Sequence, residues 1–137
     1  MSPVYLPQPL RLLVIQRAGN RCEYCLVNQE DVLLPHEPDH IIAQQHGGTS
    51  EEANLALACL HCNRNKGPNI SSIDPLTGKI AALYNPRQEA WQEHFELAGA
   101  NIIPKTPSGR ATTQLLKLNT AKRLAVRQNL IDAGRYP

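Results

Sequence analysis

Short apolar runs alternate with polar stretches along this chain, and their lengths predict small helices and strands rather than long ones. The run from Leu10 to Ile15 lies between Pro9 and the pair Gly19-Asn20. This pattern predicts a buried helix that ends at that pair. We expect this helix to pack against the segment that carries the first two cysteines.

The middle of the chain predicts a hairpin followed by a helix. Asp39 and His40 lead into an apolar Ile-Ile pair, which predicts a strand whose polar end lies at an opening. Residues 54–58 predict a second short strand. The glycine pair Gly47-Gly48 between the two strands predicts a loop, because glycine permits positive φ. The residues from Cys59 to Lys66 predict a short helix, which the following Gly-Pro pair stops.

The second half of the chain predicts a further mixture of small elements. Asp74 to Gly78 predicts a tight turn between short strands. Trp91 and Phe95 stand four residues apart, which predicts an amphipathic helix from Glu89 to Leu97 whose rings fill a small core.

A hairpin and a last helix are predicted at the C-terminal end. Residues 100–104 and 111–118 predict two strands, joined by the turn from Thr106 to Gly109. Residues 121–133 predict a helix that Thr120 caps and Gly134 ends. On this helix we expect the apolar side chains to face a core and the basic ones to face solvent: inward Leu124, Leu130 and Ile131, outward Lys122, Arg123 and Arg127.

Composition places the chain among ordinary globular proteins, since 42% of its residues are hydrophobic and 19% are charged. No apolar run reaches the about 18 residues that a membrane-spanning helix requires. Arg11 and Arg17 bracket the apolar stretch from Leu12 to Ile15, which argues against a secretory signal peptide. We therefore expect no membrane partner and a cytoplasmic location.

Charge is distributed unevenly, although the net charge is only +2. Residues 1–22 hold three bases and no acid, residues 23–98 hold four bases and eleven acids, and residues 99–137 hold seven bases and one acid. An acidic centre between basic ends is typical of a site that holds a cation while its flanks hold an anion. Short charged stretches of solvated surface explain the same pattern.

The four cysteines form two Cys-x-x-Cys pairs, Cys22 with Cys25 and Cys59 with Cys62. Each pair can form a tight turn whose sulfurs point to one side. Two such turns complete the tetrahedron of a structural Zn²⁺ site with Zn–S bonds of about 2.3 Å. Two disulfides and a thiol redox pair are the alternatives. The missing export signal counts against the first, and the lack of a βαβ pattern around Cys22 counts against the second.

The strings CEYC, DHIIAQQHGG, NLALAC and CNRNKG, in this order, resemble the motif of the HNH endonucleases. The resemblance covers about residues 18–68, and the stretch from Ile73 to Asn119 resembles the C-terminal part of a bacterial, cyanobacterial-type subgroup. It implies an α+β fold with a ββα-metal core braced by the four-cysteine zinc site. An N-terminal helix and a C-terminal β-hairpin and helix extension over residues 69–137 complete one single domain.

The resemblance also implies roles for individual residues. His40 matches the general base that activates water, and Asp39 matches the carboxylate that binds the catalytic divalent ion. Asn54 matches the central Asn of the catalytic motif, whose role is mainly to orient the hairpin loop. Asn63 stands where the motif has its final histidine. Since an amide oxygen also ligates hard cations, we expect Mg²⁺ or Mn²⁺ at Asp39 and Asn63.

In phosphodiester hydrolysis by these residues, the metal ion held by Asp39 and the water activated by His40 would approach the phosphate from different sides. Asp39 and His40 are neighbours on a strand, so their side chains point to opposite faces unless the strand bends. We therefore expect a bend or bulge at Pro38-Asp39. Basic residues are expected to contact the DNA backbone, with solvated surface as the plain alternative: Arg64, Lys66, His46, Arg110 and Lys117.

Three functions remain open at the level of sequence. The first is a metal-dependent DNA endonuclease or nickase, monomeric or homodimeric. The second is a zinc-stabilised nucleic-acid-binding module without catalysis. The third is a thiol redox protein, which would require reactive Cys22 or Cys25. The presence of Asp39, His40 and Asn63 together favours the enzyme.

Overall fold

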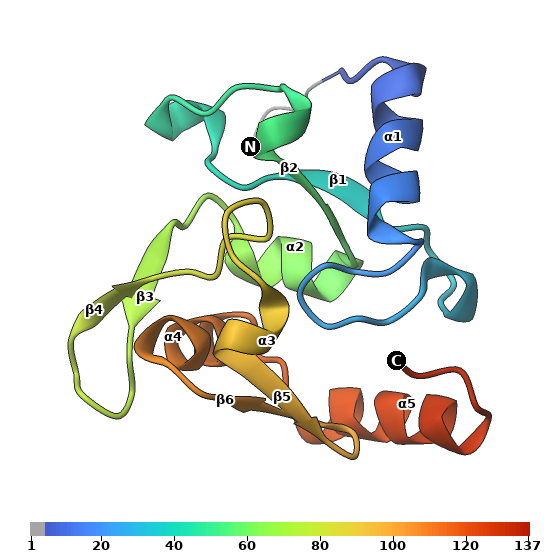
Figure 1. Cartoon of the computed structure of the whole chain (residues 1–137), viewed down its shortest axis with the longest axis vertical. Helices are drawn as coiled ribbons and strands as arrows, with labels where there is room; N and C mark the ends of the chain where they lie inside the picture. Colours follow the sequence, from blue (N-terminus) through green and yellow to red (C-terminus); the bar gives the residue numbers. More distant parts are fainter. Residues whose placement is uncertain (1–4) are drawn as a thin grey trace.

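The computed structural model describes residues 5–137, which form small helices and three two-stranded antiparallel hairpins (Figure 1). The central helix α2 lies between the hairpin of β1 and β2 and the C-terminal half of the chain. This mixture of helices with small antiparallel strand pairs confirms the predicted α+β class. Within residues 5–137, no helix has the length and apolar character required to cross a bilayer.

The predicted hairpin and helix are present in the order β1 (Glu37–His40), β2 (Leu55–Ala58) and α2 (Leu60–Lys66). The register is continuous from Glu37 opposite Ala58 to His40 opposite Leu55, so the strand has no bulge at Pro38-Asp39, contrary to the expectation of a bend or bulge there. The strand also ends at His40 instead of continuing through the two isoleucines. The polar pair therefore lies at the C-terminal end of β1, where the chain turns toward the 44–54 loop.

Helix α1 (Gln8–Ala18) forms where the sequence predicts it and ends at Gly19, whose φ of 62° is left-handed. Its packing differs from the expectation, because its buried residue Val14 belongs to a cluster with Leu55 and Leu57 of β2. The helix thus covers the β1–β2 hairpin, and the cysteines belong to another cluster. The hairpin offers α1 two fully buried leucines in one strand, whereas the buried side chains of the first cysteine turn pack into the other cluster.

The segment after α2 contains the predicted turn between short strands. Strand β3 (Ser71–Ile73) pairs with β4 (Ile80–Ala82), and the buried carboxylate of Asp74 accepts hydrogen bonds from the backbone N–H of Leu76 and the hydroxyl of Thr77. An aspartate at the first position of a turn commonly stabilises it in this way.

The region from 89 to 118 departs from the predicted elements. The helix expected over Glu89–Leu97 is reduced to α3 (Trp91–His94), and β5 (Phe95–Ala98) pairs with β6 (Asn101–Pro104). The strand expected over 111–118 is mostly helix α4 (Pro107–Leu115). The segment from Thr106 to Gly109, which the sequence predicts as a hairpin turn, instead begins this helix. The Thr106 side chain caps the helix by accepting a hydrogen bond from the backbone N–H of Gly109. The predicted C-terminal β-hairpin of the extension is therefore wrong in its pairing, although β6 itself is a predicted strand.

The last helix is confirmed as α5 (Ala121–Asp132), with the Thr120 side chain accepting from the backbone N–H of Arg123. Leu130 and Ile131 pack against a buried cluster that contains all four cysteines and apolar residues of the C-terminal half. These apolar residues include Phe95, Ile102, Leu116, Leu118 and Tyr136. The two halves of the chain thus contribute to one continuous apolar cluster around the cysteines.

Candidate metal and catalytic site

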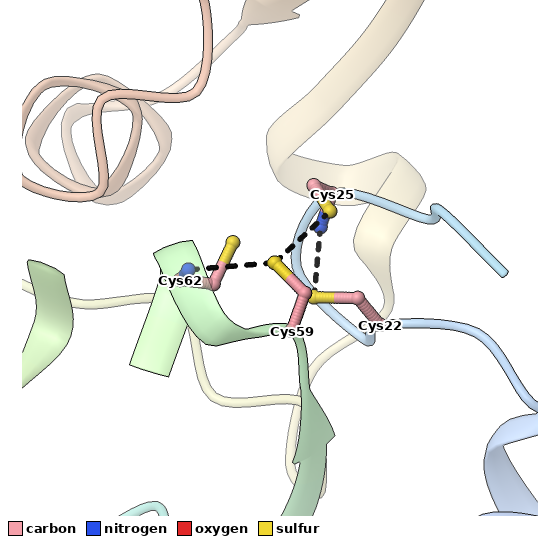
Figure 2. A group of neighbouring side chains, drawn as sticks. All are labelled: Cys22, Cys25, Cys59 and Cys62. Atoms are coloured by element: carbon pink, nitrogen blue, oxygen red, sulfur yellow. Dashed lines mark hydrogen bonds between the residues drawn. The ribbon is translucent and has the colours of Figure 1, made fainter. Parts of the chain in front are cut away.

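The four cysteines lie together in the interior, two from the turn at residues 22–25 and two from the start of α2 (Figure 2). Their sulfurs all lie within 4.8 Å of one another, and Cys25 Sγ lies 3.7 Å from Cys59 Sγ. A zinc tetrahedron with bonds of about 2.3 Å has sulfur–sulfur edges of about 3.8 Å, whereas a disulfide bond measures about 2.05 Å. The cluster therefore fits a structural zinc ion and does not consist of disulfides.

Each cysteine pair is closed by a backbone hydrogen bond to sulfur, as Figure 2 shows. The N–H of Cys25 donates to Cys22 Sγ at 3.5 Å, and the N–H of Cys62 donates to Cys59 Sγ at 3.4 Å. Burial raises the pKa of the Cys22 and Cys62 thiols well above their usual value, whereas hydrogen bonds from neighbouring cysteines lower the pKa of Cys25 and of Cys59. Deprotonating all four buried sulfurs requires a compensating cation, which a bound zinc ion supplies.

Arg123 on α5 adds a positive charge directly beside the sulfurs. Its Nη2 donates to Cys62 Sγ at 3.1 Å and lies 3.7 Å from Cys59 Sγ, while Nη1 donates to the carbonyl of Leu116 at 2.9 Å. The expectation that Arg123 and Arg127 face solvent is wrong. Arg127 is buried and donates to the carbonyl of Ala100 at 2.7 Å. Interior sulfurs and carbonyls that need donors attract these long side chains, which periodicity alone does not reveal.

The second group of functional residues lies at the end of β1, where Asp39 and His40 are both buried. Because the strand is regular, their side chains leave it on opposite faces. Asp39 faces α2, where its Oδ2 lies 3.4 Å from the ammonium of Lys66. Burial raises the pKa of Asp39 to about 6, although the Lys66 charge opposes this shift.

Lys66 is an interior residue, so its predicted contact with DNA is wrong for this structure. Only 2% of the residue is exposed, and Nζ donates to the carbonyls of His40 and Ile41 at 3.1 Å each. With Asp39 beside it, the ammonium joins the end of α2 to the end of β1. Lys66 thus fixes the backbone that carries His40, which gives it a positioning role rather than a phosphate contact.

His40 has a partner that the sequence did not reveal. Its Nε2 lies 2.9 Å from the hydroxyl oxygen of Ser50, which belongs to the loop between β1 and β2. Burial, together with the charge of Lys66, lowers the pKa of His40, so the imidazole remains neutral at neutral pH. The glycine-rich string before Ser50 predicted a loop, and only the fold brings that loop to the histidine.

Asn54 organises the same loop, in agreement with the structural role expected of it. Its Oδ1 accepts from the N–H of Ile42 at 2.9 Å, and its Nδ2 donates to the carbonyls of Ile42 and Thr49 at 2.9 and 2.7 Å. Gly48 lies so close to these hydrogen-bonded groups that an added Cβ would stand 1.7 Å from the carbonyl oxygen of Ile42. The loop therefore requires both the amide and the glycine.

Asn63 lies on α2 three residues before Lys66, so both lie on the helix face turned toward β1. Within residues 5–137, the side-chain amide of Asn63 takes part in no hydrogen bond, and Asp39 Oδ2 is buried with no partner in hydrogen-bond geometry. A carboxylate oxygen and an amide oxygen are both ligands that suit a hard divalent cation. The nearby ammonium of Lys66 provides a competing positive charge.

The remaining predicted DNA contacts divide into exposed and paired residues. Arg64, His46 and Lys117 are exposed and free to meet a phosphate. Arg110 instead forms a two-pronged ion pair with Asp74, with Nε to Oδ1 at 2.8 Å and Nη2 to Oδ2 at 2.9 Å. In this structure Arg110 anchors α4 to the turn after β3 and is not available as predicted.

Comparison with known proteins agrees with this geometry. A family model described as HNH endonuclease matches residues 22–69. The chain is also 23% identical over 124 residues to the Septu protein PtuB of Bacillus thuringiensis, an alignment that covers 89% of this chain and 46% of that protein. This chain thus spans less than half the length of that relative. No solved structure matches this chain. The matched segment includes both cysteine pairs, the β1–β2 hairpin and α2, so residues 22–69 carry the ββα-metal core of the HNH family.

Proposed function

We propose that the chain is a metal-dependent HNH endonuclease or nickase that hydrolyses DNA phosphodiester bonds. The observation that carries this proposal is the end of β1 inside the matched HNH segment. There a neutral imidazole and a buried carboxylate, whose Oδ2 has the Lys66 ammonium 3.4 Å away, lie on adjacent residues. We further propose that the HNH core and the extension over residues 69–137 fold as one domain, as a monomer or a homodimer.

His40 acts as the general base in this proposal. When the hydroxyl of Ser50 accepts a hydrogen bond from Nε2, the lone pair lies on Nδ1, where it can take the proton of an attacking water. Lys66 holds the carbonyls of His40 and Ile41 and so limits the movement of the imidazole. Ser50 and Lys66 are positioning residues, since neither needs to touch the phosphate.

Asp39 and Asn63 would hold the divalent ion of the active enzyme. When bound, this ion neutralises charge on the phosphate oxygens during cleavage. Oxygen ligands favour Mg²⁺ or Mn²⁺ over softer metals. The four cysteines leave their zinc no open position, so its role is structural.

A plasmid-nicking assay with single-turnover kinetics tests the proposal. We expect cleavage with Mg²⁺ or Mn²⁺, none after removal of free divalent ions, and a rate at least about 100-fold lower in His40→Ala. Zinc content should stay unchanged in this variant, because the cysteine site is separate. As a matched control, His46→Ala removes an exposed imidazole and should change DNA affinity without changing the rate at saturating enzyme. Full cleavage by His40→Ala would refute the mechanism.

One observation favours a second function, a zinc-stabilised nucleic-acid-binding module that does not cut. The Lys66 ammonium lies 3.4 Å from Asp39 and can neutralise this carboxylate without a metal ion. In that case the wild-type chain would bind DNA with a steep salt dependence and show no metal-dependent cleavage at all. The nicking assay separates the two functions.

A further inference from the structure

A cavity of about 350 Å³ opens on the far side of α2 from Asp39 and His40. It lies between α2, α5 and the segment from Cys25 to Val32, which Figure 1 places together near the C-terminal end of the chain. From α2 it is lined by His61 and Asn65. Successive helical residues turn by about 100°, which places these two roughly opposite Asn63 and Lys66. The cavity is therefore a separate site from the proposed catalytic one.

The charge of the lining suits an anion. No aspartate or glutamate lines the cavity, and five of the lining residues carry basic or imidazole groups. Two others, Cys25 and Cys59, belong to the cysteine cluster, whose thiolate charge Arg123 partly offsets. Arg123 and Arg127 donate to sulfur and carbonyl groups of the interior. Lys117 and Lys122 are exposed, and neither forms an ion pair or a side-chain hydrogen bond within the described residues 5–137. The N-terminus of α5, capped by Thr120, adds its unpaired N–H groups at the same place.

The C-terminal extension concentrates its unpaired positive charge at this cavity. Residues 99–137 hold seven bases, of which Arg110 and Arg135 pair with acids and Arg123 and Arg127 point inward. Three lysines remain unpaired, and two of these are Lys117 and Lys122. Positive charge that served only to keep the surface solvated would not be expected to cluster at one cavity.

The walls of the cavity are mainly apolar and include Val27, Val32 and Val126. Its volume lies in the range of about 300–1,000 Å³ that is typical of small-ligand sites. Polar groups also face it. Asn65 uses Nδ2 to donate to the carbonyl of Leu116 at 2.8 Å, which leaves its Oδ1 available to a ligand. A purely aliphatic anion would leave such polar groups unpaired, at a cost in affinity.

We propose that this cavity binds a nucleoside phosphate. The phosphate would lie between Lys117, Lys122 and the N-terminus of α5, and the nucleoside would lie against the three valines. The ligand is either a free nucleotide or the terminal nucleotide of a strand. The second source rests on the proposed nuclease function, whereas the first does not.

Isothermal titration of the full-length, zinc-loaded chain tests this site. The His40→Ala background prevents cleavage, so failure of the nuclease proposal leaves the binding result intact. The probes are AMP, a 5′-phosphorylated dinucleotide, inorganic phosphate and dodecanoate. We expect saturable binding of AMP or the dinucleotide, tighter than that of phosphate or dodecanoate by about tenfold or more. A tighter dinucleotide indicates a strand end, and a tighter AMP indicates a free nucleotide.

Three variants locate the site without touching the proposed catalytic residues. Val126→Trp, which fills the cavity from a position that is 43% exposed, should abolish binding. The double variant Lys117→Ala/Lys122→Ala should weaken it by about tenfold or more. Lys105→Ala removes an exposed lysine outside the cavity and should change the affinity less than about twofold. Equal binding by Val126→Trp and the parent, tighter binding of dodecanoate, or no saturable binding at about 5 mM would each overturn the proposal.

Discussion

At the residue scale, Asp39 and His40 experience opposite shifts from the same environment. Burial disfavours the charged form of each side chain, so it raises the pKa of the carboxyl to about 6 and lowers the pKa of the imidazole. Cation binding requires the ionised carboxylate, and proton abstraction requires the neutral imidazole. Both forms coexist above about pH 6, where Asp39 is ionised and the lowered pKa of His40 keeps the imidazole neutral. Two adjacent residues thus become ready for their separate tasks over the same range of pH.

The pH dependence of cleavage follows from these shifts. As pH falls through about 6, Asp39 takes up a proton and loses its charge, so we expect cleavage to fall in that window. Because the divalent ion competes with this proton, raising its concentration should move the acid limb to lower pH. Single-turnover rates between pH 5 and 8 at several Mg²⁺ concentrations measure the effect. An acid limb that does not respond to metal concentration would assign the limb to His40 instead of Asp39.

Lys66 and Arg64 lie two residues apart on α2 and are expected to act differently. Lys66→Met removes the ammonium that holds the carbonyls of His40 and Ile41, so we expect the cleavage rate at saturating DNA to fall by about 10–100-fold. DNA affinity should change little, because the ammonium is buried. The exposed Arg64 is the matched control, since Arg64→Ala should weaken binding and reduce the salt slope by about one while sparing the rate. Loss of affinity at full rate in Lys66→Met would show a phosphate contact after all.

At the scale of elements, adjacent glycines in the hairpin loop serve different physical needs. Gly47 has a φ of 89°, which favours glycine, but a Cβ added there would meet no atom within 4 Å. Gly48 has no space for a Cβ beside the carbonyl of Ile42, and its closest neighbours are backbone atoms that cannot move aside cheaply. The tight loop brings Ser50 to His40, so its geometry affects the catalytic residue as well as stability.

Substituting alanine for each glycine should distinguish the effect of positive φ from that of close packing. Gly47→Ala should lower the free energy of unfolding by about 1 kcal/mol through the positive φ alone. Gly48→Ala should lower it by about 2–3 kcal/mol, because the loop must shift away from Ile42. Chemical denaturation of both zinc-loaded variants measures the difference. Equal losses would mean that the loop can reshape without strain.

Prediction from sequence succeeded where local chemistry determines an element. The turn at Asp74, the end of α2 at Gly67 and the cap of α5 at Thr120 each depend on residues within one turn of the chain. It failed at Pro107 and Gly109, which are typical of a turn but here begin α4. A Cβ on Gly109 would stand only 2.4 Å from the carbonyl oxygen of His94, so packing against α3 requires this glycine.

The same distinction between local motifs and long-range contacts decided which parts of the candidate site could be predicted. Spacing alone identified the cysteine cluster, because all its ligands come from two short motifs. Ser50, Arg123 and the buried state of Lys66 could not be predicted, because each depends on a contact between segments far apart in the sequence. Arg123 is 61 residues from Cys62 along the chain. Such contacts exist only once the fold is formed.

At the scale of the whole molecule, the C-terminal half and the zinc site depend on one another. Phe95, Leu116 and Leu118 belong to the same buried cluster as the four cysteines, and Tyr136 donates a hydrogen bond to the carbonyl of Cys25 at 2.8 Å. Removing the second half would therefore uncover the apolar side of the metal site. The extension provides part of the interior of the HNH core as well as surface around it.

Arg123 is the sharpest test of this dependence, because it is the one charged contact described between α5 and the sulfurs. A zinc ion with four thiolates carries a net charge of −2, and the guanidinium halves this charge within the interior. Arg123→Met should weaken zinc affinity by about 10–100-fold, as loss of a partner to metal ligands commonly does. Competition with a chromophoric chelator measures the affinity, and Lys122→Ala, an exposed neighbour on α5, should leave it unchanged. Since Arg123→Met preserves the length of the side chain near the cavity, a lower zinc affinity would reflect lost charge and hydrogen bonding rather than lost packing. Unchanged affinity would mean that the backbone N–H groups of Cys25 and Cys62 are sufficient to balance the thiolates without help from the extension.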